Sequence, residues 1–401
     1  MLVKAACTNE VTQRWTASLG YTRTGVSPTL VRLAQKSATE ARWRPSWLSP
    51  GGLANVLLTG LGFTWKRLLK WRRHISGRKL TVEFSSPAYL SESARLASEQ
   101  LPCRVLAFYL VTAVRDPRRE ALLHKQWCRD HSIVGRVWVS SRGINAQVSG
   151  RTADCVQYAH FVAGRFPGVK GAKAKGASLL CKLDPVLEPA FPRLRVKAKK
   201  LISLAPELDR SLDMEDRGQD LEPGEWQRRM QGLESGKPGK VLDIRNNYEW
   251  DLGHFAPAKR PGTEELVEMS PSSLGLTSED KDTPLYMYCT GGIRCEFFGA
   301  ALRKKGFRQV YKLKGGVQHY GNTVGDEGWK GRLFVFDRRN SVAVGLEGSA
   351  SQLACPICGG GVVEEFWNCA NLDCNRRVVA CRACAERLLG CCQECRHRQG
   401  Q

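Results

Sequence analysis

The sequence predicts a multidomain protein of mixed α/β and α+β class that ends in a small cysteine-rich tail. The chain has 401 residues, more than one domain usually holds. Strand-like and helix-like segments alternate in two separate regions, and nine of the 16 cysteines fall between Cys355 and Cys395. Hydrophobic residues make up 42% and charged residues 25%, which excludes a wholly disordered or fibrous chain. No apolar run reaches the roughly 18 residues of a membrane-spanning helix.

Residues 1–80 have the composition of an organelle-targeting leader. They hold 14 Lys and Arg against two acids, Glu10 and Glu40, and they are rich in Ser and Thr. About half of the formal net charge of +22 therefore belongs to this segment. The alternatives are a disordered tail, a wrongly chosen start codon and, more weakly, a peripheral membrane helix.

Residues 101–200 are expected to form a ferredoxin-like domain of the split βαβ type. Short apolar runs predict strands at 105–114, 133–140, 144–149, 179–183 and 193–199, and longer patterns predict helices at 118–131 and 152–165. The domain holds 19 basic and 6 acidic residues. Such an excess of positive charge favours a polyanionic partner such as nucleic acid.

Two basic clusters in this domain are the candidate RNA contacts. They comprise Lys170, Lys173 and Lys175, and then Arg193, Arg195 and Lys197. Alternation from 193 to 199 places positive side chains on one face of a strand, which suits contacts with phosphates. The alternative is a solvated basic face without a ligand.

Residues 205–238 are rich in Asp, Glu, Gly and Pro and are expected to be a linker, in which Pro223 opens a helix. In residues 239–340 the alternation of strands and helices resumes. Strands are expected at 240–244, 285–288 and 310–313 and a helix at 296–305, which predicts an α/β domain with a parallel sheet.

The run from Cys289 to Arg294 predicts a reactive loop between a strand and a helix. Gly291 and Gly292 let backbone N–H groups converge on one point, and the helix N-terminus adds positive potential there. With the charge of Arg294, these groups are expected to lower the pKa of Cys289 and to favour the nucleophilic thiolate. The alternative is a strand-to-helix turn around a structural cysteine.

The remaining loop members have supporting roles. Thr290 and Ile293 complete the loop. Cys295 follows it directly, either as a resolving thiol for an oxidised Cys289 or as a small residue of the first helical turn.

Residues upstream place this loop in a known pattern. Asp243, Arg245, Glu249 and the pair Gly253-His254, together with the six-residue loop, resemble a rhodanese domain. The resemblance implies a catalytic Cys289 with Arg294. It gives Asp243, Arg245, Glu249 and His254 structural roles that brace the loop, because ion-pair networks are more often structural than catalytic.

The match extends beyond one domain. The segments 142–147 (RGINAQ), 191–196 (FPRLRV), 221–226 (LEPGEW) and 313–316 (LKGG) also follow one family. Over residues 103–395 the chain resembles the rhodanese-containing tRNA uridine 5-hydroxylases, the TrhO-like proteins, which include chloroplast members of plants and algae.

The family resemblance implies an activity, its substrates and a location. The activity is oxygen-dependent 5-hydroxylation of the wobble uridine of tRNA, with Cys289 as the active-site residue. Molecular oxygen is the co-substrate, and no flavin, haem or nicotinamide is expected. The expected location is the chloroplast, with the mitochondrion as the alternative.

Two other functions use the same residues. A sulfurtransferase would carry sulfane sulfur as a persulfide on Cys289, taken from thiosulfate or another sulfur donor. A non-catalytic RNA- or protein-binding adaptor would be organised by the tail, but the intact loop from Cys289 to Arg294 counts against it. The oligomeric state stays open.

The cysteine tail has the spacing of zinc ribbons. Eight cysteines are expected as ligands of two closed structural sites: Cys355, Cys358, Cys369, Cys374, Cys381, Cys384, Cys392 and Cys395. One of Cys391 and Cys392 is then spare, and the spacing does not say which pairs share a site. The alternatives are reduced thiols and, least favoured, disulfides.

Overall fold

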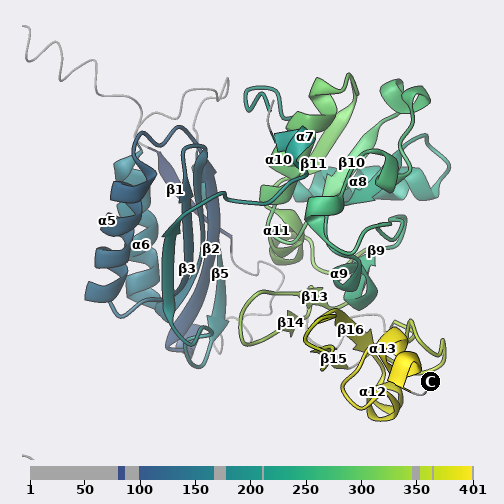
Figure 1. Cartoon of the computed structure of the whole chain (residues 1–401). Helices are drawn as coiled ribbons and strands as arrows, with labels where there is room; N and C mark the ends of the chain where they lie inside the picture. The colour runs from purple at the N-terminus through teal and green to yellow at the C-terminus, as the bar shows by residue number, and fades with distance from the viewer. Residues whose placement is uncertain are drawn as a thin grey trace, which may run out of the picture. The chain divides into compact units, whose positions relative to one another are not determined.

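The structure, a computed structural model, describes residues 80–85, 99–166, 178–209, 212–345, 353–363 and 365–399 (Figure 1). The expected leader lies outside the described residues except for Leu80, and so do Lys170, Lys173 and Lys175. All described residues belong to one unit that begins at Ser76. Within these ranges no helix is long and apolar enough to cross a membrane.

The first domain is a six-stranded sheet in the order β1-β5-β2-β4-β3-β6, with two helices on one face (Figure 1). The strands are β1 (Thr81–Ser85), β2 (Cys103–Val111), β3 (Val134–Ser140), β4 (Gly143–Arg151), β5 (Ser178–Val186) and β6 (Leu194–Ala198). The helices are α5 (Pro117–Asp130) and α6 (Thr152–Arg165). The predicted ferredoxin-like arrangement is confirmed. Strand β1, which pairs in parallel with β5, is an addition that the sequence pattern did not predict.

Alternation along the strands leaves one face of this sheet without helices. Val137 and Val139 of β3 are fully buried in the core that the helices cover. Arg136 and Trp138 alternate with them, point to the other face and are only partly buried. Helix α5 begins after Asp116, whose carboxylate accepts a hydrogen bond of 3.0 Å from the Arg119 backbone N–H.

The second domain is built on a parallel sheet in the order β7-β11-β10-β8, as the alternating pattern predicts. Its strands are β7 (Gln219–Leu221), β8 (Lys240–Asp243), β10 (Leu285–Tyr288) and β11 (Val310–Leu313). Its helices are α8 (Pro223–Glu234), α9 (Asn247–Leu252), α10 (Ile293–Lys304) and α11 (Gly316–Thr323). Strands β9 (Gly253–Phe255) and β12 (Trp329–Gly331) form an antiparallel pair. Three short 3-10 helices lie between β9 and β10: η1 (Leu266–Glu268), η2 (Ser272–Leu274) and η3 (Ser278–Asp282).

Residues 205–238, which their composition predicts as a linker, instead carry α7 (Pro206–Asp209), β7 and α8. Strand β7 extends the parallel sheet beside β11. The acids of this segment pair with lysines on and after β11: Asp220 lies 3.0 Å from Lys312, and Glu222 lies 2.7 Å from Lys314. The acidic composition therefore reflects ion pairing within the fold.

The tail follows a short ribbon of β13 (Leu333–Phe334) and β14 (Ser341–Val342). It contains the antiparallel pair β15 (Glu365–Asn368) and β16 (Arg377–Ala380), then α12 (Arg382–Leu388) and α13 (Gln393–Gln399). Arg377 lies over the rings of Tyr248 (5.2 Å) and Phe334 (4.8 Å), which attaches the tail to α9.

Candidate functional site

The loop from Cys289 to Arg294 connects β10 to α10 and wraps its backbone around one sulfur atom. The Gly292 backbone N–H donates a hydrogen bond of 3.1 Å to Cys289 Sγ, and Gly292 takes a positive φ of 97° that favours glycine. The first turn of α11 packs against the loop, and the Val317 backbone N–H donates a hydrogen bond of 3.0 Å to the Cys289 carbonyl. A Cβ on Gly316 would lie 2.5 Å from that carbonyl oxygen, so only glycine fits there.

The surroundings of Cys289 favour its thiolate. Complete burial alone would raise the pKa of the thiol. A hydrogen bond from Cys295, the charge of Arg294 and the backbone N–H groups of both residues outweigh burial and lower the pKa of Cys289 to about 6. Burial, together with the same hydrogen bond to Cys289, raises the pKa of Cys295 well above its usual value. The two thiols therefore behave as an acceptor and a donor, a relation that the spacing alone did not reveal.

Arg294 is held by a buried carboxylate. Its guanidinium donates two hydrogen bonds to Glu249, of 2.6 and 2.8 Å, and one of 3.1 Å to Thr290 Oγ1. Thr290 Oγ1 also donates to Glu249 over 3.1 Å. Glu249 is fully buried; burial alone would raise the pKa of its carboxyl, but the charge of Arg294 holds it below the usual value. The loop is thus fixed at its far end by a bidentate ion pair.

The other bracing residues lie behind the loop. Arg245 donates to both carboxylate oxygens of Asp243 (2.8 and 2.6 Å) and to the Gly253 carbonyl (2.7 Å), and all of these groups are buried. Tyr288 at the end of β10 donates to the same Asp243 carboxylate over 2.7 Å. His254 stacks on Trp250 with ring centroids 3.7 Å apart. This network ties β8, β9 and β10 together just before the loop starts.

A cavity of about 610 Å³ borders the loop, and both domains line it. The first domain contributes side chains from β2, β3, β4 and β5, and the second contributes the loop and the start of α9. Cys289 borders this cavity but its side chain has no exposed surface, so a ligand reaches Sγ only when neighbouring side chains move.

Lys182 of β5 is a site residue that the sequence did not reveal. Only 2% of it is exposed, and its ammonium donates a hydrogen bond of 3.2 Å to the carbonyl of Gly291 inside the loop. Burial lowers the pKa of Lys182 to about 8. A second link joins the domains, since the Tyr109 hydroxyl of β2 donates to Glu296 of α10 over 2.9 Å. Nothing in local spacing marks either residue, because both contacts join segments more than 100 positions apart.

The predicted RNA contacts that the structure describes lie at the edge of the first sheet. Arg195 and Lys197 are exposed residues of β6, and Arg193 is exposed just before it. In the register of β6 with β3, Arg195 is opposite Arg136 and Lys197 is opposite Trp138. The basic edge is therefore continuous with the sheet face that lines the cavity.

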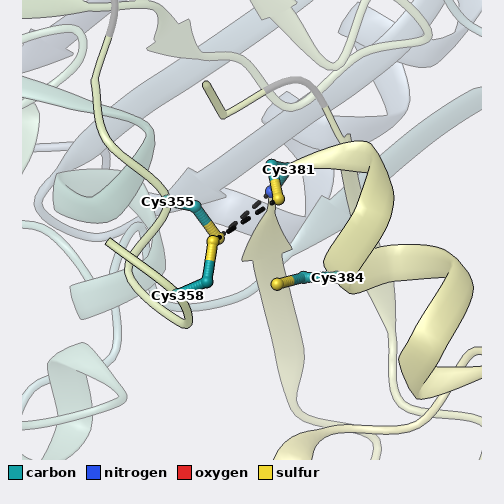
Figure 2. A group of neighbouring side chains, drawn as sticks. All are labelled: Cys355, Cys358, Cys381 and Cys384. Carbon is teal, nitrogen blue, oxygen red and sulfur yellow. Dashed lines mark hydrogen bonds between the residues drawn. The ribbon is translucent and has the colours of Figure 1, made fainter. Parts of the chain in front are cut away.

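The eight predicted cysteine ligands gather into two groups of four. One contains Cys355, Cys358, Cys381 and Cys384, and the other contains Cys369, Cys374, Cys392 and Cys395. Within each group the sulfur atoms all lie within 4.8 Å of one another, so each group can hold a metal ion. Figure 2 shows the first group, in which two ligands come from a loop and two from the start of α12.

The pairing of the cysteines is interleaved. The first and third pairs along the chain share one group, and the second and fourth share the other. Cys391 belongs to neither group. Such a crossed arrangement cannot be read from spacing.

Known family models match three consecutive parts of the chain. The UPF0176 acylphosphatase-like domain covers residues 103–202, the rhodanese-like domain covers 225–323 and the rhodanase C-terminal region covers 330–396. Fold and loop therefore define a rhodanese-type protein with an acylphosphatase-like N-terminal domain.

Proteins of similar sequence assign the chain to a particular family within this class. A Protochlamydia amoebophila protein named tRNA uridine(34) hydroxylase is 37% identical over 290 residues, which cover 72% of this chain and 86% of that protein. The protein of the same name from Chlamydia caviae is 38% identical over 72% of this chain and 84% of its own length. The chain belongs to the tRNA uridine(34) hydroxylase family. A solved rhodanese-like domain from Anabaena sp. is 28% identical over 28% of this chain and 78% of its own, with a TM-score of 0.22.

Proposed function

We propose that this protein hydroxylates the wobble uridine of tRNA at C5 and that Cys289 is the nucleophile. The observation that carries the proposal is the shared cavity. A cysteine whose pKa is lowered to about 6 borders a space of about 610 Å³, and the opposite wall belongs to a basic domain. Such a volume lies within the range of small-molecule sites and suits a base that has been turned out of the RNA stack.

The proposed chemistry begins with the thiolate. Sγ of Cys289 adds to C6 of the uracil ring, and the electron pair of the C5–C6 bond moves toward C5 and the C4 carbonyl. C5 then reacts with the oxidant, and loss of the C5 proton with departure of the thiolate restores the double bond. Replacing hydrogen by hydroxyl removes two electrons from the base. With molecular oxygen as the oxidant, the second oxygen atom leaves as water after taking two electrons and two protons from an added reductant.

Arg294 acts in this scheme as a positioning residue. Both ends of its guanidinium are bound to Glu249 and Thr290, so it holds the loop closed around the sulfur atom. Its charge also favours the thiolate of Cys289. A nearby cation of this kind supports ionisation of the nucleophile without contacting the substrate.

Sulfur transfer is the alternative use of the same loop. A persulfide on Cys289 would be stabilised by the same backbone N–H groups and the same arginine. A small donor such as thiosulfate, however, needs neither the wall from the first domain nor the basic edge along β6. The shared cavity therefore favours the RNA substrate.

We further propose that the two cysteine groups bind zinc in a structural role. Four thiolates per group form a soft donor set typical of zinc, and an all-cysteine site leaves no position for a substrate. The metal would then hold β16 and α12 in place, and through Arg377 it would support Tyr248 at the cavity wall.

We also propose that a basic leader within residues 1–80 directs the protein to a plastid and is removed there by cleavage before Leu80, which belongs to the core of the first domain. The basic, acid-poor composition of residues 1–80 supports this proposal. A fusion of this segment to a fluorescent protein tests it in plant cells. Plastid fluorescence is expected, and diffuse or mitochondrial fluorescence would overturn the plastid assignment.

Nucleoside mass spectrometry tests the main proposal. Unmodified tRNA is incubated with the purified full chain, oxygen and a reductant, and 5-hydroxyuridine is quantified after digestion. The hydroxylase proposal expects this product. Its absence, together with sulfur transfer from thiosulfate to cyanide, would favour the alternative.

A further inference from the structure

The helix-free face of the first sheet carries two rows of side chains that run from the basic edge strand to the reactive loop. The first row consists of Lys197, Trp138, Asn145 and Tyr109, which face one another across β6, β3, β4 and β2. The second row consists of Arg195, Arg136, Gln147, Ala107 and Lys182. Neighbouring strands lie about 4.8 Å apart, so the first row spans about 14 Å.

The inner members of both rows line the cavity beside Cys289. Trp138, Asn145 and Tyr109 border it in the first row, and Arg136, Gln147 and Lys182 border it in the second. Each row therefore starts with an exposed cation on β6 and ends at a residue that contacts the second domain, either through Glu296 or through Gly291. A ligand lying along a row would have one end at the loop.

The middle of the rows offers two side-chain amides without a hydrogen bond and the guanidinium of Arg136, which lies 5.9 Å from the centroid of the Phe191 ring. Among the described residues, no hydrogen bond joins the side-chain amide of Asn145 or Gln147 to another residue, and Arg136 forms no ion pair there. All three side chains are partly buried. Two amides at this depth present donors and acceptors of the kind that read base edges.

Trp138 adds an aromatic surface to the first row. Its ring is partly buried and packs on one side against the apolar core cluster that includes Leu201 and Leu204. The ammonium of the exposed Lys199 lies 4.9 Å from the ring centroid. An exposed lysine is easily displaced from an aromatic ring and can move to a phosphate. A nucleobase would take its place by stacking, the contact by which sheet platforms of this topology hold single-stranded RNA.

We propose that this face binds the single-stranded nucleotides that flank the target uridine, a role that rests on the proposed function. Trp138 stacks on a neighbouring base, Asn145 and Gln147 hydrogen-bond to base edges, and Arg195 and Lys197 contact the phosphates. The wobble uridine is a loop nucleotide, so its neighbours are unpaired and can lie on the sheet while the uridine enters the cavity. Substrate choice would then depend on the bases on either side of the uridine.

Steady-state kinetics and direct binding on an anticodon stem-loop RNA test the proposal with the full chain. Trp138→Ala is expected to weaken binding about 5- to 150-fold, with a matching rise in KM and little change in kcat. Trp138→Phe, which keeps an aromatic ring, is expected to recover most of the affinity. Thermal denaturation of each variant separates lost binding from lost folding.

A second variant covers the case in which Trp138→Ala does not fold. Gln147→Ala should weaken binding and reduce the preference among RNAs that differ only in the flanking bases, a readout that a structural role would not move. Gln126→Ala is the matched control, because Gln126 is exposed on α5, on the opposite face of the domain. It should bind and discriminate as the wild type does.

Failure of the proposed RNA-binding face and failure of the proposed hydroxylation give different results in these experiments. Wild-type turnover with unchanged KM and unchanged flanking-base preference in Gln147→Ala, and in Trp138→Ala where it folds, would overturn the platform. RNA binding that depends on Trp138, without any 5-hydroxyuridine formed, would support the platform and overturn the proposed reaction.

Discussion

Replacing Glu249 by Gln should both destabilise the protein and disorganise the reactive loop. Glu249 is fully buried and accepts hydrogen bonds of 2.6 and 2.8 Å from Arg294. Glutamine keeps the shape but leaves the arginine charge buried without a counter-charge. Removing one partner of a buried ion pair typically costs about 3–5 kcal/mol. At about 2–4 °C per kcal/mol, the melting temperature should fall by about 6–20 °C.

The assay is thermal denaturation of the full chain, followed by activity at a temperature where the variant is folded. Glu225→Gln is the matched control, because Glu225 pairs with Arg228 and Arg229 on the surface of α8 and should contribute less than about 1 kcal/mol. A Glu249→Gln variant that melts within about 2 °C of the Glu225→Gln variant and keeps its activity would refute the bracing role.

The pH dependence of this difference has a definite sign. The pKa of Glu249 is lowered in the folded state from its ordinary value of 4.5; burial opposes the shift and Arg294 causes it. The stabilisation is therefore fully present above the unfolded-state pKa and is lost as the pH falls through the folded-state pKa. The gap between wild type and Glu249→Gln should be complete at neutral pH and shrink in acid below about 4.5. A gap that widened in acid would contradict this assignment.

Three further predictions concern the thiol pair, the tail and the N-terminal strand. Activity on tRNA should rise as the pH passes about 6, where Cys289 ionises. The Cys295→Ala variant should show this rise at higher pH, because the substitution removes a hydrogen bond to the sulfur of Cys289. An unchanged pH profile would argue against the pairing of the two thiols. Elemental analysis should find one metal ion for each cysteine group, with one lost in Cys384→Ala and none in Cys391→Ala. Equal losses in both variants would contradict the placement of Cys391 outside both groups. A chain that starts at Glu99 loses the Ser85 hydrogen bonds to α11. It should be at least about 2 kcal/mol less stable in urea denaturation than a chain that starts at Ser76, and equal stability of the two would show that β1 contributes nothing.

Local patterns were sufficient where a residue's environment depends on its near neighbours in sequence. Helix 152–165 and strands 285–288 and 310–313 have the predicted bounds, because periodicity and burial agree within each element. The reactive loop was found for the same reason, since its two glycines, its cysteine and its arginine are consecutive. Asp243, Arg245, Glu249 and His254 needed the family pattern.

Contacts between residues far apart in the chain could not be predicted from the sequence. Strand β7 has only three residues and lies in an acidic stretch, and its strand character depends on β11 almost 100 positions later. Lys182 belongs to an ordinary alternating strand, and only the approach of the second domain makes it a site residue. The interleaved cysteine groups likewise depend on how the tail folds back on itself.

The most direct test of the central claim compares wild type with Cys289→Ala on the same tRNA. The full chain is incubated with unmodified tRNA, oxygen and a reductant, and nucleosides from the anticodon loop are quantified by mass spectrometry. We expect 5-hydroxyuridine at the wobble position with the wild type and none with Cys289→Ala, while both bind the tRNA equally well. Equal product from the two proteins would contradict the role of the cysteine, and no product from the wild type would contradict the proposed activity.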